Sequence, residues 1–108
     1  MSYGLIDSEI QAWALKHSLK LFTSFAGLDA RFVYVASKAG ECFQISIDPP
    51  VDGRIGVHAS CIDGRPDEYP PQDWDATQAT VQAVLDSAFQ TVVGWMAPSE
   101  RFFPPKYQ

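Results

Sequence analysis

Basic residues are scarce in this chain. Its 108 residues include eight Lys and Arg against thirteen Asp and Glu, which gives a formal net charge of −5. Proteins that bind nucleic acid cluster their basic side chains against phosphates, so a few scattered cations argue against nucleic acid as a partner. The acidic balance instead favours a basic partner protein, although a charge of this size also serves solubility alone.

Long apolar runs and cysteines are scarce as well. No stretch approaches the roughly 20 apolar residues of a membrane span, and the N-terminus has no basic region followed by an apolar core. Two cysteines are too few for a disulfide framework. We therefore expect a cytoplasmic protein that makes no contact with a membrane and keeps both thiols reduced.

Motifs for catalysis or for cofactor binding are absent. The sequence contains no phosphate-binding glycine loop, nucleophile elbow, dinucleotide fingerprint or metalloprotease motif. Its cysteines and histidines lack the paired spacing of a zinc site, and the acidic residues of segment 63–75 lack the alternating oxygen ligands of a calcium loop. We expect no cofactor, no metal and no enzymatic activity.

The composition is that of a globular domain. Hydrophobic residues make up 46% of the sequence and charged residues 19%, and 108 residues are enough to bury a core without disulfides or metal. We expect a single domain over residues 1–108, in which about 98–108 form an aromatic, proline-rich C-terminal tail.

Apolar spacing predicts two helices. The longest pattern predicts a helix from about Asp75 to Met96, with Asp73 or Asp75 as its N-cap. Its apolar stripe has helical spacing and consists of Val81, Val84, Leu85, Ala88, Phe89, Val92, Val93 and Met96. A shorter helix begins at Ser8, whose side chain can cap it, and ends near Ser18.

Between the helices the apolar residues alternate, which is typical of strands. The four expected strands are about Leu19 to Ala26, Arg31 to Ser37, Cys42 to Asp48, and Arg54 to Ile62. The joins between them are short and rich in turn residues, so consecutive strands form hairpins. The sequence predicts an α+β fold of order α-β-β-β-β-α, a four-stranded antiparallel meander with both helices packed on one face.

Alternation also predicts which face each strand buries. The helix side should carry Val33, Val35, Phe43, Ile45, Ile47, Ile55, Val57 and Ala59, with Leu21 and Phe25 beside them. The predicted register sets Ile47 opposite Ile55 and Asp48 opposite Arg54, an opposite-charge pair of the kind that sheets favour. It also points Cys42 and Cys61 to opposite faces, so they cannot form a disulfide.

The other face should be open and unusually aromatic. By the same alternation it carries Phe22, Phe32 and Tyr34, with Gln44 and His58 among its polar residues. Proteins rarely expose such an aromatic cluster to solvent, so another segment or molecule should cover it. The open alternatives are the chain's own tail or its 63–74 loop, a second copy in a homodimer, and a ligand or partner protein.

The function favoured by these features is a non-enzymatic, acidic protein-binding module. The expected binding residues are Phe22, Phe32, Tyr34, Gln44 and His58 on the open face, together with Asp67 and Glu68 in the acidic 63–75 loop. Small acidic domains of this size occur among bacterial immunity proteins and secretion chaperones, where a negative surface neutralises a basic client. That comparison rests on size, charge and element order alone.

Two other functions stay open. One is a small-molecule site between the aromatic face and the tail, with Tyr34, Gln44 and His58 as polar contacts. The other is a small cysteine-dependent enzyme, because the predicted register sets Cys42 diagonally from His58 and opposite Ser60, and a nearby imidazole can activate a thiolate. A flat sheet face offers no oxyanion pocket, which argues against catalysis.

Overall fold

The computed structural model describes residues 3–37, 40–62 and 69–96. Helices and strands follow one another as η1 (Tyr3–Leu5), α1 (Asp7–Lys16), β1 (Phe22–Phe25), β2 (Leu28–Ala36), β3 (Cys42–Ile47), β4 (Ile55–Cys61), β5 (Gln72–Ala76) and α2 (Val81–Trp95). The predictions for residues 63–68 and for the C-terminal tail fall outside this part of the chain.

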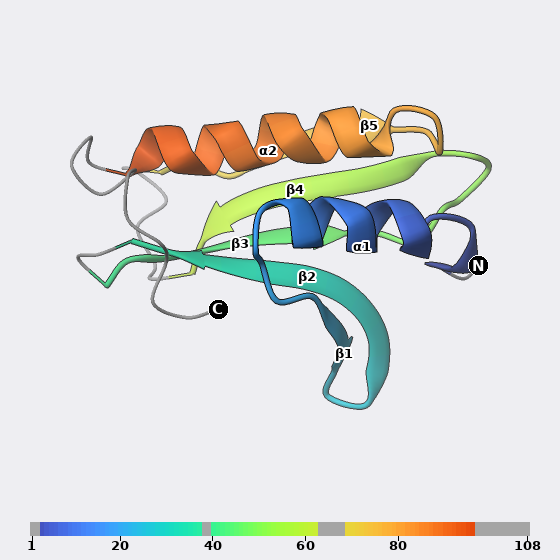
Figure 1. The fold of residues 1–108 in the computed structure, drawn as a ribbon, viewed down its shortest axis with the longest axis horizontal. Helices are drawn as coiled ribbons and strands as arrows, with labels where there is room; N and C mark the ends of the chain where they lie inside the picture. The colour runs from blue at the N-terminus through green and yellow to red at the C-terminus, as the bar shows by residue number, and fades with distance from the viewer. Residues whose placement is uncertain (1–2, 38–39, 63–68, 97–108) are drawn as a thin grey trace.

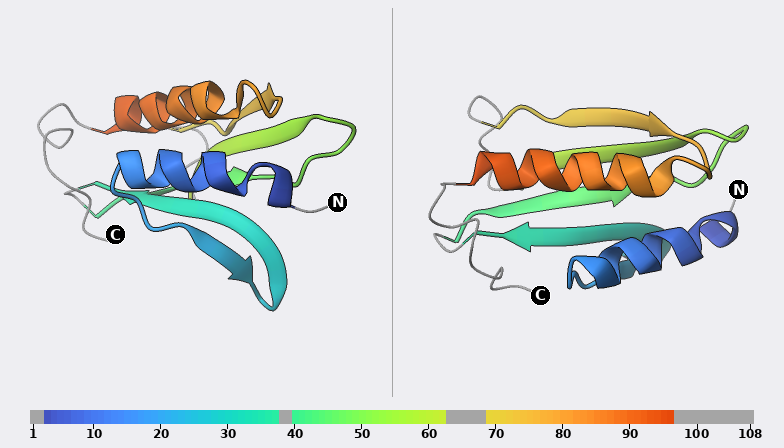
Figure 2. Two further views of the ribbon diagram at one scale, coloured as in Figure 1. Left: turned by 45° about the vertical axis from the view of Figure 1, so that its right-hand side comes forward. Right: turned by 45° about the horizontal axis from the view of Figure 1, so that its top comes forward.

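The strands form one antiparallel sheet in the order β1-β2-β3-β4-β5. Both helices lie on one face of it, α2 along β4 and β5 and α1 beside α2 (Figures 1 and 2). The hairpin of β1 and β2 curls away from the helix layer (Figure 1). The predicted α+β fold with a helix-covered meander is confirmed, but the sheet has five strands and the prediction of four was wrong.

The additional strand, β5, occupies residues that we assigned to a connector and to the start of the long helix. Trp74 pairs with Val57 and Ala76 with Ile55, so their side chains extend the buried face beyond β4. Asp73 and Asp75 alternate with them and lie on the open face. They therefore do not cap a helix.

The long helix starts later than predicted. It begins at Val81 after Thr80, whose hydroxyl accepts a hydrogen bond from the backbone N–H of Thr77. The first helix starts one residue before the predicted cap, because Asp7 is already helical. The Ser8 hydroxyl donates to the Glu9 carboxylate and does not act as the N-cap. For the long helix, strand pairing of Gln72 to Ala76 with β4 overrode the local capping signal.

A two-residue turn closes the hairpin of β3 and β4. Val51 and Arg54 exchange two backbone hydrogen bonds around Asp52 and Gly53, which both have positive φ (53° and 78°), the geometry that suits Asp-Gly in a tight hairpin. Pro49 and Pro50 then lie opposite the single residue Ile55 as a bulge, since Asp48 bonds to Gly56.

This turn corrects the predicted register between β3 and β4. Ile47 pairs with Val57 and Ile45 with Ala59, two positions away from the prediction. Asp48 is therefore opposite Gly56 and does not pair with Arg54. The shift is an even number of residues, so the buried faces are unchanged. The register predicted between β2 and β3, with Val33 opposite Ile45, is confirmed.

The core follows the predicted helix side of the sheet. All eight principal residues predicted there are at most 2% exposed: Val33, Val35, Phe43, Ile45, Ile47, Ile55, Val57 and Ala59. Leu21 packs at their margin. Phe25 was wrongly placed with them. The register shifts between Phe22 and Ser24, and Phe25 is 62% exposed on the side of Phe32.

Arg31 ties the N-terminal segment to the sheet. Its guanidinium donates to both carboxylate oxygens of Asp7, at 2.7 and 3.1 Å, and to Asp29 at 2.6 Å. It also stacks over the Tyr3 ring at 4.4 Å, and the Tyr3 hydroxyl donates to the carbonyl oxygen of Ile47. The start of α1, β2 and the end of β3 are thereby joined by one set of polar contacts.

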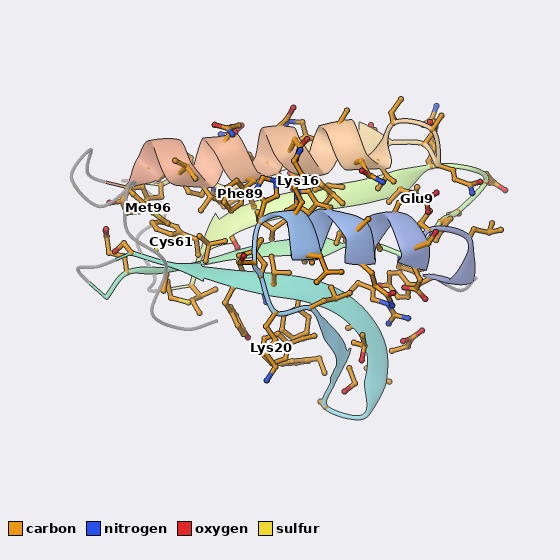
Figure 3. All side chains as sticks on the ribbon, in the orientation of Figure 1. Glu9, Lys16, Lys20, Cys61, Phe89 and Met96 are labelled. Atoms are coloured by element: carbon orange, nitrogen blue, oxygen red, sulfur yellow. The ribbon has the colours of Figure 1, made fainter. Side chains whose placement is uncertain are left out.

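The two cysteines are both thiols on opposite faces, as predicted. Cys61 packs at the margin of the core on the helix side, where Figure 3 labels it. Within the described residues, neither helix has the length and apolar character that crossing a bilayer requires.

Candidate functional site

The open face of the sheet has two halves of different chemistry. The aromatic half lies on β1 and β2 and consists of Phe22, Phe25, Phe32 and Tyr34. The polar half lies on β3 to β5 and consists of Gln44, Ser46, Asp48, His58, Ser60, Asp73 and Asp75. Gln44 stands between the halves, with Tyr34 on one neighbouring strand and Ser60 on the other.

The predicted aromatic residues are in contact. Phe22 and Phe32 stack with ring centroids 5.1 Å apart, and Tyr34 meets each of them edge-on at 5.4 Å. The ammonium of Lys20 lies 5.0 Å from the centre of the Phe22 ring, on the side of the sheet away from the helices (Figure 3). Phe32 is buried among these rings, whereas Phe25 leaves an apolar edge at the surface.

His58 is the centre of the polar half. Its Nδ1 lies 2.6 Å from Asp73 Oδ1 and its Nε2 lies 2.7 Å from Asp48 Oδ2. Asp73 stands directly across from His58 on β5, while Asp48 follows the last residue of β3. The imidazole therefore links three neighbouring strands through two carboxylates.

A glycine allows this arrangement. Gly56 lies beside Asp48, and a methyl group at position 56 would overlap Asp48 Oδ2 and come within 3.1 Å of His58 Nε2. Without a side chain there, the Asp48 carboxylate can extend over β4 and reach the imidazole.

The two carboxylates favour the charged form of His58. Hydrogen bonds to Asp48 and then to Asp73 raise the pKa of His58 above its ordinary value, and burial opposes this only in part. A neutral imidazole has one N–H, so it can donate to only one of the two carboxylates. The geometry in which both are engaged is that of the imidazolium ion.

A pocket of about 320 Å³ opens beside this group. Its lining consists of Asp48, Pro49, Val51, Arg54, Gly56, His58, Asp73, Trp74 and Asp75. Within the described residues, neither the Arg54 guanidinium nor the Asp75 carboxylate has a hydrogen bond or ion pair with another side chain. The pocket therefore combines apolar surface from Pro49 and Val51 with unmatched charges of both signs.

Too few candidate metal ligands gather around His58 in the described part of the chain. In residues 3–37, 40–62 and 69–96 no group of three or more His, Cys, Asp or Glu side chains could hold a metal ion. Both ring nitrogens of His58 already face carboxylate oxygens, which leaves none to coordinate a cation.

No protein-family model, curated protein or solved structure matches the chain.

The predicted binding residues are only partly brought together. Phe22, Phe32 and Tyr34 form one cluster, and Gln44 adjoins it. His58 is on the same face but belongs to the acidic group farther along the sheet. Asp67 and Glu68 lie outside the described residues.

The predicted convergence of a thiol, an imidazole and a hydroxyl was wrong. Ser60 stands opposite Gln44, His58 stands opposite Ser46, and the carbonyl oxygen of Cys42 accepts a hydrogen bond from Ile62. Cys42 and His58 are therefore separated along the strands, and the corrected register removes the geometric argument for a Cys–His pair.

Sequence reasoning missed the residues that surround His58. The sequence pattern assigns Asp73 and Asp75 to the acidic 63–75 loop and the cap of the long helix, and it pairs Asp48 with Arg54. The signal that could have found them is the alternation from Gln72 to Ala76, where Trp74 and Ala76 point one way and two aspartates the other.

Proposed function

We propose that this chain is a non-enzymatic binding module that takes up a basic segment of another protein on the open face of its sheet. The observation that carries the proposal is the set of exposed carboxylates on β3 and β5. The side chains of Asp48 and Asp73 are 57% and 73% exposed, and their partner His58 engages only one oxygen of each. Asp75 adds a further charge without a partner in the described chain.

The aromatic half complements this acidic half. Exposed carboxylates attract a basic partner and orient its approach, whereas aromatic side chains supply the apolar anchor that dominates affinity. Phe25 and Tyr34 lie in the same face as the acids, so one extended segment could meet both. An immunity-protein-like or secretion-chaperone-like role and a cytoplasmic location accord with this chemistry and remain part of the proposal.

The test uses the full chain and a fluorescein-labelled peptide in which arginines are spaced by leucine and glycine. We expect its anisotropy to report binding at low salt that weakens several-fold at about 300 mM salt, because solvent-exposed charges are screened. Asp73→Asn should weaken binding by about three- to tenfold.

The matched control is Asp52→Asn. It removes the same charge from a turn outside the pocket, and asparagine accepts the positive φ of that position. Equal affinity of the two variants, or equal binding of an acidic peptide of the same length, would contradict the proposal.

A small-molecule site is the second candidate, and the pocket favours it. Its volume of about 320 Å³ lies at the lower end of the range for small-ligand sites, roughly 300–1,000 Å³. The pocket lining supports a ligand beside His58, away from the aromatic cluster named in the sequence prediction. Thermal stabilisation by a small cation that is lost in Asp73→Asn, without binding of the basic peptide, would favour this candidate.

A further inference from the structure

We propose that the pocket beside His58 receives an arginine side chain of the partner, and that its guanidinium competes with the ring proton of His58 for the carboxylates of Asp48 and Asp73. This inference rests on the proposed function, because it names the partner group that the acidic half binds.

The pocket offers acceptors that His58 leaves unused. His58 contacts Asp48 Oδ2 and Asp73 Oδ1, so Asp48 Oδ1 and Asp73 Oδ2 remain available, as do both oxygens of Asp75. A guanidinium is planar, carries five N–H donors and binds pairs of carboxylate oxygens more specifically than an ammonium does. The acceptors therefore suit arginine better than lysine.

The remaining lining suits the stem of such a side chain. Pro49 and Val51 contribute apolar surface next to the acids, and arginine buries its methylene groups against such surface while its head stays polar. Gly56 leaves room over β4 for the Asp48 carboxylate, which holds that acid at the pocket. Arg54 lies in the same lining and limits the charge that can enter, because it opposes a second cation.

His58 connects binding to pH. The pocket is lined by three carboxylates and by the Arg54 guanidinium. The net charge of the lining is therefore −2 when His58 is neutral and −1 when His58 is protonated. Two carboxylates contact the His58 ring: Asp48, which follows the last residue of β3, and Asp73 on β5. Ser46 lies opposite His58 on β3, and Arg54 and Asp75 lie farther along the pocket.

Loss of the ring proton leaves one of the two carboxylates without its donor. A guanidinium can supply that donor. The raised pKa of His58 shows that the two carboxylates already favour a cation between them. Deprotonation of His58 should therefore strengthen arginine binding, and bound arginine should in turn promote loss of the proton.

The probe is N-acetyl-arginine methylamide, titrated into the isotope-labelled full chain and followed by NMR. We expect saturable shifts of the Gly56 amide and of the His58 ring signals, with affinity near pH 8 about tenfold higher than near pH 5.5, where Asp side chains stay ionised. The pKa of His58 should fall when the probe is saturating. The citrulline analogue, which is neutral and of similar shape, should cause no such shifts.

Three variants distinguish binding in the pocket from electrostatic attraction to the acidic face as a whole. Gly56→Ala places a methyl group against Asp48 and should reduce probe affinity by about tenfold or more. His58→Gln should still bind but lose the difference between the two pH values, because glutamine does not titrate. Asp52→Asn is the control and should bind as the parent chain does.

The outcomes distinguish this inference from the proposed function. Two results would overturn the pocket assignment alone, provided that the basic peptide still binds. One is that the citrulline analogue causes the same NMR shifts as the arginine probe, and the other is that the arginine probe does not shift the Gly56 and His58 signals. A parent chain whose affinity does not change with pH would overturn the competition with His58. Failure of both the probe and the basic peptide to bind would remove the proposed function as well.

Discussion

His58 shows how one side chain can couple folding to pH. It donates to Asp48 and Asp73 only as an imidazolium, and these bonds exist only where β3, β4 and β5 are assembled. Hydrogen bonding first to Asp48 and then to Asp73 raises its pKa in the folded chain above the ordinary value of about 6.5. Protonation and folding of this part of the sheet therefore favour each other.

We predict that His58→Gln lowers the free energy of unfolding more at low pH than at high pH. Because the folded pKa is raised, the stabilisation is complete below the unfolded pKa and is lost as the pH rises through the folded pKa. The expected difference is about 0.5–1 kcal/mol near pH 5.5 for a pair of partly exposed ion pairs, and it should shrink toward zero near pH 9. Urea unfolding of both proteins across this range measures it.

Ser46→Ala supplies the comparison for this prediction. Ser46 stands opposite His58 and does not titrate, so its effect on stability should be the same at each pH. A His58→Gln effect that stayed constant or grew with pH would show that the imidazolium does not stabilise the sheet.

At the scale of elements, β5 explains most of what the sequence failed to predict. Gln72 to Ala76 contains one strong strand former, Trp74, and two aspartates that are typical of turns and helix caps. Its pairing with β4 buries Trp74 and Ala76 against the core, and that tertiary gain is invisible to local propensity. The acidic site around His58 was missed because half of it lies on β5.

The β3–β4 hairpin is a second element that the sequence predicted incorrectly. Five residues between two apolar strands suggested a loop, but Asp52 and Gly53 close a two-residue turn and the prolines form a bulge. The buried faces could be predicted, because a shift of the strand register by an even number of residues leaves each side chain on the same face. The cross-strand neighbours of Asp48 and His58 could not, because they depend on the turn.

Arg31 gives a prediction about how α1 is held. Arg31→Lys should lower the free energy of unfolding by about 1–3 kcal/mol, because an ammonium cannot bond both oxygens of Asp7 and also reach Asp29. Arg31 is only 11% exposed, so the lost bonds are not simply replaced by water. Denaturant unfolding of the variant measures the change.

Arg54→Lys is the matched control, since the Arg54 guanidinium has no side-chain hydrogen bond in the described part of the chain. It should change stability by less than about 0.5 kcal/mol. A similar loss in both variants would mean that the Arg31 contacts contribute nothing specific.

The whole molecule has one core and a divided outer face. The helices and the inner side of the sheet share a single apolar cluster, while the outer side changes from aromatic on β1 and β2 to acidic on β3 to β5. Alternation predicted Phe22, Phe32 and Tyr34 of the aromatic half correctly, but it placed Phe25 on the wrong face. The acidic half becomes visible only when all five strands are assembled.

This division predicts where an anionic apolar dye binds. Anilinonaphthalene sulfonate should bind at the aromatic half, beside Lys20 and away from the carboxylates. Phe25→Ser should reduce its fluorescence by about twofold or more, since Phe25 is 62% exposed at the end of that cluster. Leu15→Ser on α1 removes a side chain that is 79% exposed and should leave the fluorescence unchanged. Equal losses in the two variants would contradict this location.

The aspartates of β5 should also affect pairing between copies of the protein at this edge of the sheet. β5 is the outermost strand of the described sheet, and an outermost strand presents unpaired backbone groups that can recruit another chain. Antiparallel pairing of two such strands would bring Asp73 and Asp75 of one copy close to those of the other, and like charges across a strand pair are destabilising. The charges proposed to attract a basic partner should therefore oppose edge-to-edge pairing between copies, so one pair of side chains would serve both effects.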